Sequence, residues 1–171
     1  MINLQELMKT SKESLPDIYC DLDSVLVDLM GGAGELLGEP FDTADKGERW
    51  KKIAQTKGFW ENLDWMPGGK KLYQFIARYN THVLSAYSTR DPSSKNGKMK
   101  WLKKNTKFTI SNINLVRRAE KKNFAMTNDK PNVLIDDFIQ NIKEWEAKGG
   151  IGIHHTNVGK TLAELKRLGF K

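Results

Sequence analysis

Two groups of carboxylates follow short apolar runs in this sequence. Asp21 and Asp23 come directly after residues 18–20, and Asp136-Asp137 come directly after residues 133–135. Because side chains alternate along an extended chain, those of Asp21 and Asp23 project to the same side. Clustered carboxylate oxygens suit a hard cation such as Mg²⁺. The spacing therefore predicts a magnesium site built from acids at the ends of two strands.

A carboxylate at a strand end can also attack a phosphate ester if its charge is offset. At about 4 Å a carboxylate and a phosphate dianion repel each other by roughly 8 kcal/mol at an effective dielectric constant of about 20. A metal ion and a lysine would offset this repulsion, and Ser85, which follows an apolar run, would orient the phosphoryl group. Asp21 would then form an aspartyl-phosphate, while Asp23 would protonate the leaving oxygen and later activate water. The predicted chemistry is two-step hydrolysis.

The elements that must position these residues alternate along the chain. We expect core strands over residues 18–22, 81–85, 112–116, 132–137 and 151–153. Between and after them, apolar spacing predicts helices near residues 72–79, over 94–104 with Met99 and Leu102 on the inner face, over 139–148, and at the C-terminus around Leu165. Such alternation predicts an α/β fold with a mostly parallel central sheet flanked by helices. In such folds ligands bind beyond the carboxyl ends of the strands, where both acidic groups lie.

The alternation is interrupted between residues 29 and 66. Residues 29–37 and 43–55 have helical patterns, with glycine and proline between them and no strand. We therefore expect a small inserted helical cap over residues 29–66. The α/β core would consist of residues 1–28 and 67–171.

Taken in order, these motifs resemble the four motifs of the haloacid dehalogenase-like (HAD) superfamily of phosphatases. The resemblance rests on Asp21-Leu22-Asp23 with Val25-Leu26, on Ser85 after an apolar strand, on a lysine, and on Asp136-Asp137. Residues 18–28, 58–63, 66–68 and 134–137 look more specifically like the 5'(3')-deoxyribonucleotidase branch. This resemblance spans most of the chain and implies a Rossmann-like core with a small cap.

The resemblance also implies roles for the acids. Asp21 would be the nucleophile, and Asp23 would be the general acid and base. Asp21, Asp136 and the backbone carbonyl of Asp23 would hold Mg²⁺. Asp137 would lie next to these ligands without contacting the ion itself.

The lysine of the family precedes the acidic pair by a short, variable segment. Lys121 fits that pattern best, and Lys122 and Lys130 are alternatives. The sequence departs from the family pattern at two places. Ser24 stands where the family commonly has glycine, and residues 125–131 lengthen the path from the lysine to the acids. Neither departure removes a catalytic group, but the second leaves the choice of lysine open.

Four further residues are candidates for contacting the substrate. By the same resemblance Phe59 and Trp60, where the cap returns to the core, would line the pocket and stack on a base, although core packing explains them equally well. Arg90 and Lys98, which follow Ser85, would bind substrate phosphate. Their alternative roles are to cap the turn after the strand and to form a solvated helix face.

Positive charge is concentrated in one segment of the chain. The net charge is +7 at pH 7, and residues 95–122 contain ten lysines and arginines against one acid, Glu120. Such a segment can attract nucleic acid or an anionic substrate. A solvated helix face explains most of these residues equally well.

The rest of the composition excludes several classes of protein. The N-terminal residues 1–9 are spaced like a short amphipathic helix and lack the apolar core of a signal peptide. No apolar run approaches the roughly 20 residues of a membrane-spanning helix. The single cysteine, Cys20, excludes an intramolecular disulfide and a zinc cluster. We expect a cytoplasmic protein without a membrane partner.

Three functions are compatible with these patterns. The first is a Mg²⁺-dependent nucleotidase acting on small phosphorylated substrates, preferably deoxyribonucleoside monophosphates. The second is a nucleic-acid end phosphatase that uses the basic segment over residues 95–122. The third is a metal-binding scaffold without activity, against which the intact Asp21 and Asp23 argue. No oligomeric state is predicted.

Overall fold

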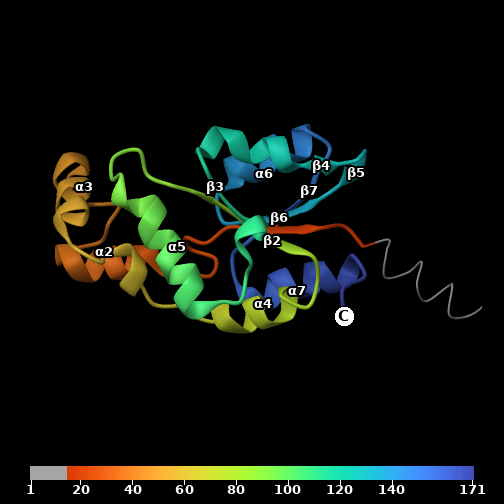
Figure 1. Cartoon of the computed structure of the whole chain (residues 1–171), viewed down its shortest axis with the longest axis horizontal. Coiled ribbons are helices and arrows are strands. Elements are labelled where there is room, and N and C mark those ends of the chain that lie inside the picture. Colours follow the sequence, from red (N-terminus) through yellow and green to blue (C-terminus); the bar gives the residue numbers. More distant parts are fainter. Residues whose placement is uncertain (1–14) are drawn as a thin grey trace, which may run out of the picture.

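The structure is a computed structural model that describes residues 15–171, so the helix expected over residues 1–9 lies outside the described part (Figure 1). Its strands are β1 (Ile18–Cys20), β2 (Thr81–Ala86), β3 (Ile113–Val116), β4 (Met126–Thr127), β5 (Lys130–Pro131), β6 (Val133–Asp136) and β7 (Ile151–His154). Its α-helices are α2 (Leu29–Leu37), α3 (Lys46–Gln55), α4 (Gly69–Ile76), α5 (Ser93–Asn105), α6 (Ile139–Ala147) and α7 (Val158–Arg167). Short 3₁₀ helices are η1 (Trp60–Asn62), η2 (Ile110–Asn112) and η3 (Arg118–Phe124).

The central sheet has five strands in the order β3-β2-β1-β6-β7, and every neighbouring pair is parallel. The α/β fold with a parallel sheet flanked by helices is thus confirmed. Cys20 at the end of β1 pairs with Val83 of β2 and with Ile135 of β6. The residues that follow these three positions therefore emerge at one edge of the sheet.

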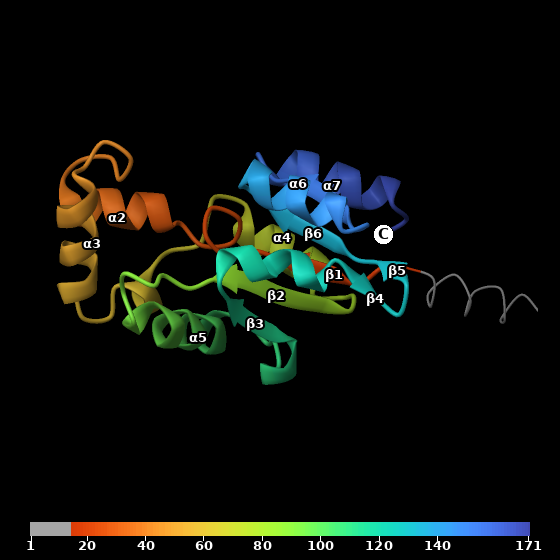
Figure 2. The same ribbon diagram turned by 90° about the horizontal axis from the view of Figure 1, so that it is seen from above.

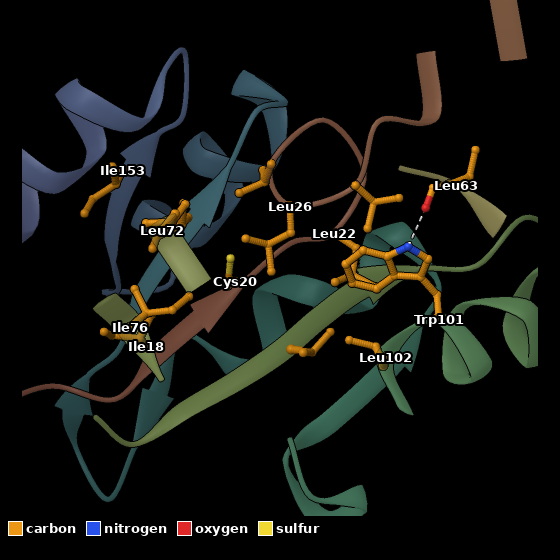
Figure 3. Close-up of a cluster of buried hydrophobic side chains, with 14 of the residues drawn as sticks. Ile18, Cys20, Leu22, Leu26, Leu63, Leu72, Ile76, Trp101, Leu102 and Ile153 are labelled. Atoms are coloured by element: carbon orange, nitrogen blue, oxygen red, sulfur yellow. Dashed lines mark hydrogen bonds between the residues drawn. The ribbon is translucent and has the colours of Figure 1, made fainter. Parts of the chain in front are cut away.

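Alternation along the central strands divides the core between the two faces of the sheet. Ile18 and Cys20 belong to a cluster with residues of α4, α5 and α7, part of which is drawn in Figure 3. Tyr19, between them, faces the opposite side and packs with Trp145 of α6. Figure 1 accordingly has α6 on one side of the sheet and α4 and α7 on the other. Helices thus cover both faces, as expected for buried parallel strands.

Helices α2 and α3 lie beyond the end of the sheet toward which β2 points (Figure 2). The chain leaves and re-enters the core through two adjacent segments. The Asp28 amide donates to the Asp64 carbonyl at 2.9 Å, and the Met66 amide donates to the Leu26 carbonyl at 2.8 Å. The Trp101 indole of α5 also donates to the Leu63 carbonyl at 2.8 Å, a bond drawn in Figure 3. These contacts fix the helical insertion at the carboxyl edge of the sheet.

Three local expectations differ from the structure. Strand β1 ends at Cys20 rather than at residue 22, because the Leu22 carbonyl accepts from three amides of a tight loop. The inner face of α5 carries Lys98, Trp101 and Leu102, whereas Met99 is only partly buried. The helix expected over residues 43–55 begins at Lys46, because the Asp45 side chain caps its first turn.

The extra residues at 125–131 form a small hairpin of β4 and β5. Asn128 and Asp129 have φ angles of 50° and 62°, and two successive positive values are typical of a tight two-residue hairpin turn. The insertion therefore lengthens the chain without displacing β6. Within residues 15–171, no helix is both long and apolar enough to cross a bilayer.

Candidate active site

Asp21 stands where β1 leaves the sheet. Its amide still donates to the Ile135 carbonyl of β6, at 2.9 Å, so the backbone position is fixed by the sheet. Its Oδ1 accepts from the Leu22 amide at 2.8 Å, and the residue is 6% exposed. Ser24, three residues after Asp21, has a φ of 63°, a left-handed conformation that glycine adopts without strain. A glycine at this position would therefore fit the backbone better than serine does.

Lys121 joins Asp21 to Asp136. Its Nζ lies 3.1 Å from Oδ2 of Asp21 and 2.7 Å from Oδ2 of Asp136, and its side chain is 3% exposed. The two carboxylates outweigh burial and raise the pKa of the Lys121 ammonium, which therefore stays charged. Of the other lysines considered for this role, Lys122 lines a small separate cavity and Lys130 lies in the exposed strand β5. The geometry brings Lys121 to the acids.

Asp136 is held on both oxygens at the end of β6. Its Oδ1 accepts from the Phe138 amide at 2.9 Å, and its Oδ2 accepts from the Asn141 side-chain amide at 3.0 Å as well as from Lys121. Burial and the nearby Asp21 charge raise the pKa of Asp136 to about 6. Burial and the charges of Asp21 and Asp136 raise the pKa of Asp137 to about 7. These carboxyls repel one another when no further cation is present.

The carboxylates of Asp21, Asp136 and Asp137 lie close enough together for each to offer an oxygen to one hard cation. One oxygen from each of Asp21, Asp136 and Asp137 can be chosen so that all lie within 4.8 Å of one another. Mg²⁺ prefers such oxygens at about 2.1 Å, which puts opposite ligands about 4.2 Å apart, so small side-chain movements would suffice. Burial and the concentrated negative charge of the group together raise the pKa values of Asp136 and Asp137. The residues present therefore fit Mg²⁺, and Asp137, expected behind the ligands, contributes an oxygen to the group.

The carboxylate of Asp23 has a separate lysine. Lys98 of α5 has its Nζ 2.5 Å from Oδ2 of Asp23 and 3.1 Å from Oγ of Ser85, to which it donates. Lys98 and Ser85 are 3% and 0% exposed, whereas the Asp23 side chain is 25% exposed. Burial raises the pKa of Asp23, and the Lys98 charge opposes that effect. Each acid of the Asp-Leu-Asp motif is thus paired with its own buried lysine.

Beside Asp23 lies a cavity of about 280 Å³. It is bounded by the cap on one side and by the loop after β2 on the other; its lining residues are Asp23, Leu29, Trp50, Trp60, Ala86, Tyr87, Ser88, Thr89 and Arg90. Two further cavities, of about 460 and 300 Å³, are larger but are lined by neither acid of the motif. We therefore take the smaller cavity, which contains Asp23, as the one next to the chemistry, and we call it the Asp23 cavity.

The aromatic residues of the cap are arranged differently from the expected pair. Trp60 lines the Asp23 cavity but is only 4% exposed. Phe59 packs edge-on against Trp60, with centroids 5.3 Å apart, and lines the other two cavities. Trp50 of α3, only partly buried, lies against Trp60 at a centroid distance of 6.5 Å and also lines the Asp23 cavity. Of the two tryptophans that line the Asp23 cavity, Trp50 is therefore the one more available to a ligand.

A buried carboxylate that sequence reasoning missed holds Trp60 in place. Asp91 is 1% exposed, and its Oδ2 accepts from the Trp60 indole at 2.6 Å. Its Oδ1 accepts from the amide and the hydroxyl of Ser93 at the start of α5. The Lys98 ammonium in turn lies 5.2 Å from the centroid of the Trp60 ring. An Asp-Pro pair before a helix indicates a helix start, but nothing local indicates the partner Trp60, 31 positions earlier.

Three solved structures align with most of this chain. A hydrolase from Streptococcus pneumoniae TIGR4 aligns with 89% of this chain and 98% of its own, at a TM-score of 0.52 and 12% identity. A hydrolase from Pseudomonas syringae aligns with 91% of this chain and 90% of its own, at a TM-score of 0.49 and 16% identity. A HAD-superfamily hydrolase, subfamily IA, from Geobacter sulfurreducens PCA aligns with 88% of this chain and 96% of its own, at a TM-score of 0.46 and 13% identity.

No protein-family model matches the sequence, and the search of curated proteins finds no match. The structural similarity at 12% identity concerns the fold alone. It covers 89% of this chain and 98% of that hydrolase. The chain therefore has an α/β fold with a parallel central sheet that it shares with a bacterial hydrolase.

Proposed function

We propose that this protein is a Mg²⁺-dependent phosphatase that hydrolyses nucleotides, as a 5'(3')-deoxyribonucleotidase does, through an aspartyl-phosphate. The observation that carries this proposal is the pairing of Asp21 with Lys121 and of Asp23 with Lys98 at the carboxyl edge of the sheet. Four charged groups at one edge, beside a cavity, can neutralise a phosphate, attack it and move a proton. The hydrolase named among the structural neighbours agrees with this chemistry.

In the proposed reaction the Asp21 carboxylate attacks phosphorus. Its Oδ1 is anchored by the Leu22 amide, so the carboxylate is oriented before the substrate arrives. Lys98 and the Ser85 hydroxyl would bind the phosphoryl oxygens, because Lys98 contacts both Ser85 and Asp23, and Asp23 borders the cavity. Mg²⁺ held by Asp21, Asp136 and Asp137 would neutralise charge on the phosphate.

Asp23 would move the proton in both half-reactions. It borders the cavity that would hold the leaving group, so it can protonate the departing oxygen. Once that product leaves, the same carboxylate can accept a proton from the water that attacks the aspartyl-phosphate. The raised pKa of Asp23 favours the protonated form that the first half-reaction requires. Lys121, which contacts both Asp21 and Asp136, would hold the nucleophile beside the metal ligand.

The Asp23 cavity supports a nucleotide as the substrate. Its cap wall includes the partly exposed ring of Trp50, on which a base can stack. The basic segment gives less support to the nucleic-acid alternative. Lys98 and Lys121 are buried in the site, and Lys100 and Arg118 pair with Glu61 and Glu144.

The remaining charge of the segment is divided between the two ends of the sheet. Asn112, five residues after Lys107, donates to the Thr81 carbonyl at the start of β2, so this part of the segment lies at the amino ends of the strands. Arg117, in contrast, follows the carboxyl end of β3. A continuous track for a phosphodiester chain does not result from this distribution.

The test is phosphate release with Mg²⁺ from 5' and 3' mononucleotides, 5'-phosphorylated oligonucleotides and an aryl phosphate. Asp21→Asn is compared with Asp42→Asn, a change at an exposed cap residue. We expect mononucleotide turnover that falls about a thousandfold or more in Asp21→Asn and is unchanged in Asp42→Asn.

If Asp21→Asn is as active as the wild type, the proposal that Asp21 is the nucleophile is wrong. Oligonucleotide turnover that exceeds mononucleotide turnover and declines steeply with salt would favour the nucleic-acid end phosphatase. No release from any substrate would favour the metal-binding scaffold.

A further inference from the structure

Two cations that form no ion pair with an acid of residues 15–171 flank the Asp23 cavity. Arg90 is exposed and lines the cavity directly. Lys95 is exposed on the first turn of α5, and its Nζ lies 5.3 Å from the ring centroid of Tyr87, another lining residue. We call Arg90 and Lys95 the cationic rim. The rim belongs to the cavity that would hold the leaving group, not to the position of the reacting phosphate.

In the described part of the chain, neighbouring carboxylates do not balance the charge of the rim. Within residues 15–171, the ion pairs closer than 4.0 Å involve other basic residues, namely Lys98, Lys100, Arg118, Lys121 and Arg167. The nearest acid along the chain, Asp91, is buried and directs its oxygens at Trp60 and Ser93. The acid that shares the cavity, Asp23, is already paired with Lys98. An anion at the rim would therefore meet positive charge without displacing an internal partner.

The residues that line the cavity between the rim and Asp23 are suited to contact the sugar and the base of a nucleotide. Ser88 and Thr89 offer hydroxyls, and Trp50 offers an aromatic surface on the opposite, cap side. If the reacting phosphate lies at Asp21 and Asp23, the leaving group occupies this cavity. An anionic substituent on that leaving group can then reach Arg90, whose guanidinium binds phosphate oxygens through paired hydrogen bonds.

We propose that the favoured substrates are nucleotides that carry a second phosphate group, as deoxynucleoside 3',5'-bisphosphates do, and that the cationic rim binds the phosphate that is not cleaved. This inference rests on the proposed phosphatase function. Hydrolysis releases the reacting phosphate and leaves the second phosphate on the product. A terminal phosphodiester of an oligonucleotide offers related chemistry with less charge. The lysines toward the far end of α5, Lys103 and Lys104, do not continue the rim at this edge of the sheet.

The experiment compares kcat/KM for a deoxynucleoside 5'-monophosphate, the 3',5'-bisphosphate of the same base and a 5'-phosphorylated oligonucleotide, at equal free Mg²⁺. The variants are Arg90→Gln and Lys95→Gln, and Lys103→Gln is the matched control on the same helix as Lys95. We expect the wild type to prefer the bisphosphate by about tenfold, the effect of one charged hydrogen-bonded contact that is partly exposed to solvent. Arg90→Gln should remove most of this preference, Lys95→Gln part of it, and Lys103→Gln none.

A bisphosphate preference near one in the wild type overturns the inference, as does a preference that Arg90→Gln leaves intact. A larger preference for the oligonucleotide than for the bisphosphate also overturns it. Calorimetric binding of both nucleotides to Asp21→Asn separates this result from a failure of the phosphatase proposal. If no substrate is hydrolysed by the wild type, the phosphatase proposal fails, while tighter binding of the bisphosphate that depends on Arg90 would still support the rim. Equal binding of the two nucleotides would overturn the rim as well.

Discussion

Replacing Asp137 by asparagine should stabilise the metal-free protein near neutral pH. Asp137 shares a small volume with Asp21 and Asp136, and the pKa of its carboxyl is raised to about 7 by burial and by these two charges. An asparagine keeps the shape of the side chain and removes the charge. The variant therefore removes a repulsion that the folded protein bears in the absence of a cation.

The sign and size of the effect follow from linkage. A carboxyl whose pKa is higher in the folded than in the unfolded chain makes the folded state bind the proton more tightly, so the free energy of unfolding falls as pH rises from about 4 to about 7. A pKa of about 7 against an ordinary 3.8 corresponds to about 4 kcal/mol for an isolated group. Coupling to Asp136 and partial exposure of Asp137 reduce this to roughly 2 kcal/mol. The free energy of unfolding of the wild type should therefore fall by roughly 2 kcal/mol between about pH 4 and about pH 7. That of Asp137→Asn should not show this fall.

Urea unfolding at about pH 5 and about pH 7.5, with a chelator or with Mg²⁺ near 10 mM, measures the effect. At the higher pH Mg²⁺ should stabilise the wild type by about 2 kcal/mol, the value expected if the concentration is a few tens of times the dissociation constant. The gain should be smaller at the lower pH, because protons compete for the same oxygens. Asp42→Asn, an exposed change in the cap, is the control. An Asp137→Asn variant that is less stable than wild type at about pH 7.5 without Mg²⁺, or that keeps the wild-type pH dependence, would refute the reasoning.

Three further substitutions test single contacts. Lys98→Met should lower kcat/KM by about a hundredfold, because it removes the cation at Asp23, and Lys103→Met is the matched control in the same assay. Asp91→Ala should lower stability by about 1–3 kcal/mol in urea unfolding by leaving the Trp60 indole without an acceptor. The same change should cost clearly less in a Trp60→Phe background, and an equal cost in both backgrounds would contradict a role through Trp60. Ser24→Gly should raise stability by about 1 kcal/mol in the same unfolding assay, since its φ of 63° favours glycine, and a loss of stability would contradict this.

The core strands were predictable because each is a short apolar run bounded by polar residues. The expected strand over residues 132–137 is β6, and the strand over 81–85 is β2, each within a residue or two at the ends. Errors arose where a side chain or a loop ended an element. Asp45 starts α3 later than its pattern indicates, and the loop that begins at Leu22 shortens β1.

The acids of the site were predictable from their place at strand ends, whereas their partners depend on tertiary packing. Lys98 is four residues before Leu102, so helical spacing places it on the inner face of α5, but the pattern does not reveal that its partners are Ser85 and Asp23. Trp50 is one of few apolar residues in α3, so its pattern indicates only an inner face. Whether that face packs on the core or contacts a ligand depends on the position of the cap. Periodic patterns in a single sequence do not encode that position.

The pairing of each motif acid with its own lysine explains how so many charges can share one edge of the sheet. Lys121 is enclosed by Asp21 and Asp136 and has almost no exposed surface, so its charge is balanced by the proposed nucleophile and the proposed metal ligand. Lys98 pairs instead with Asp23, whose side chain is one quarter exposed at 25% and borders the cavity. An arriving phosphate can therefore compete for Lys98 without disturbing Lys121. When phosphate replaces Asp23 as the partner of Lys98, the Asp23 carboxylate would be released to carry the proton. Substrate binding would therefore be coupled to the release of the proposed general acid.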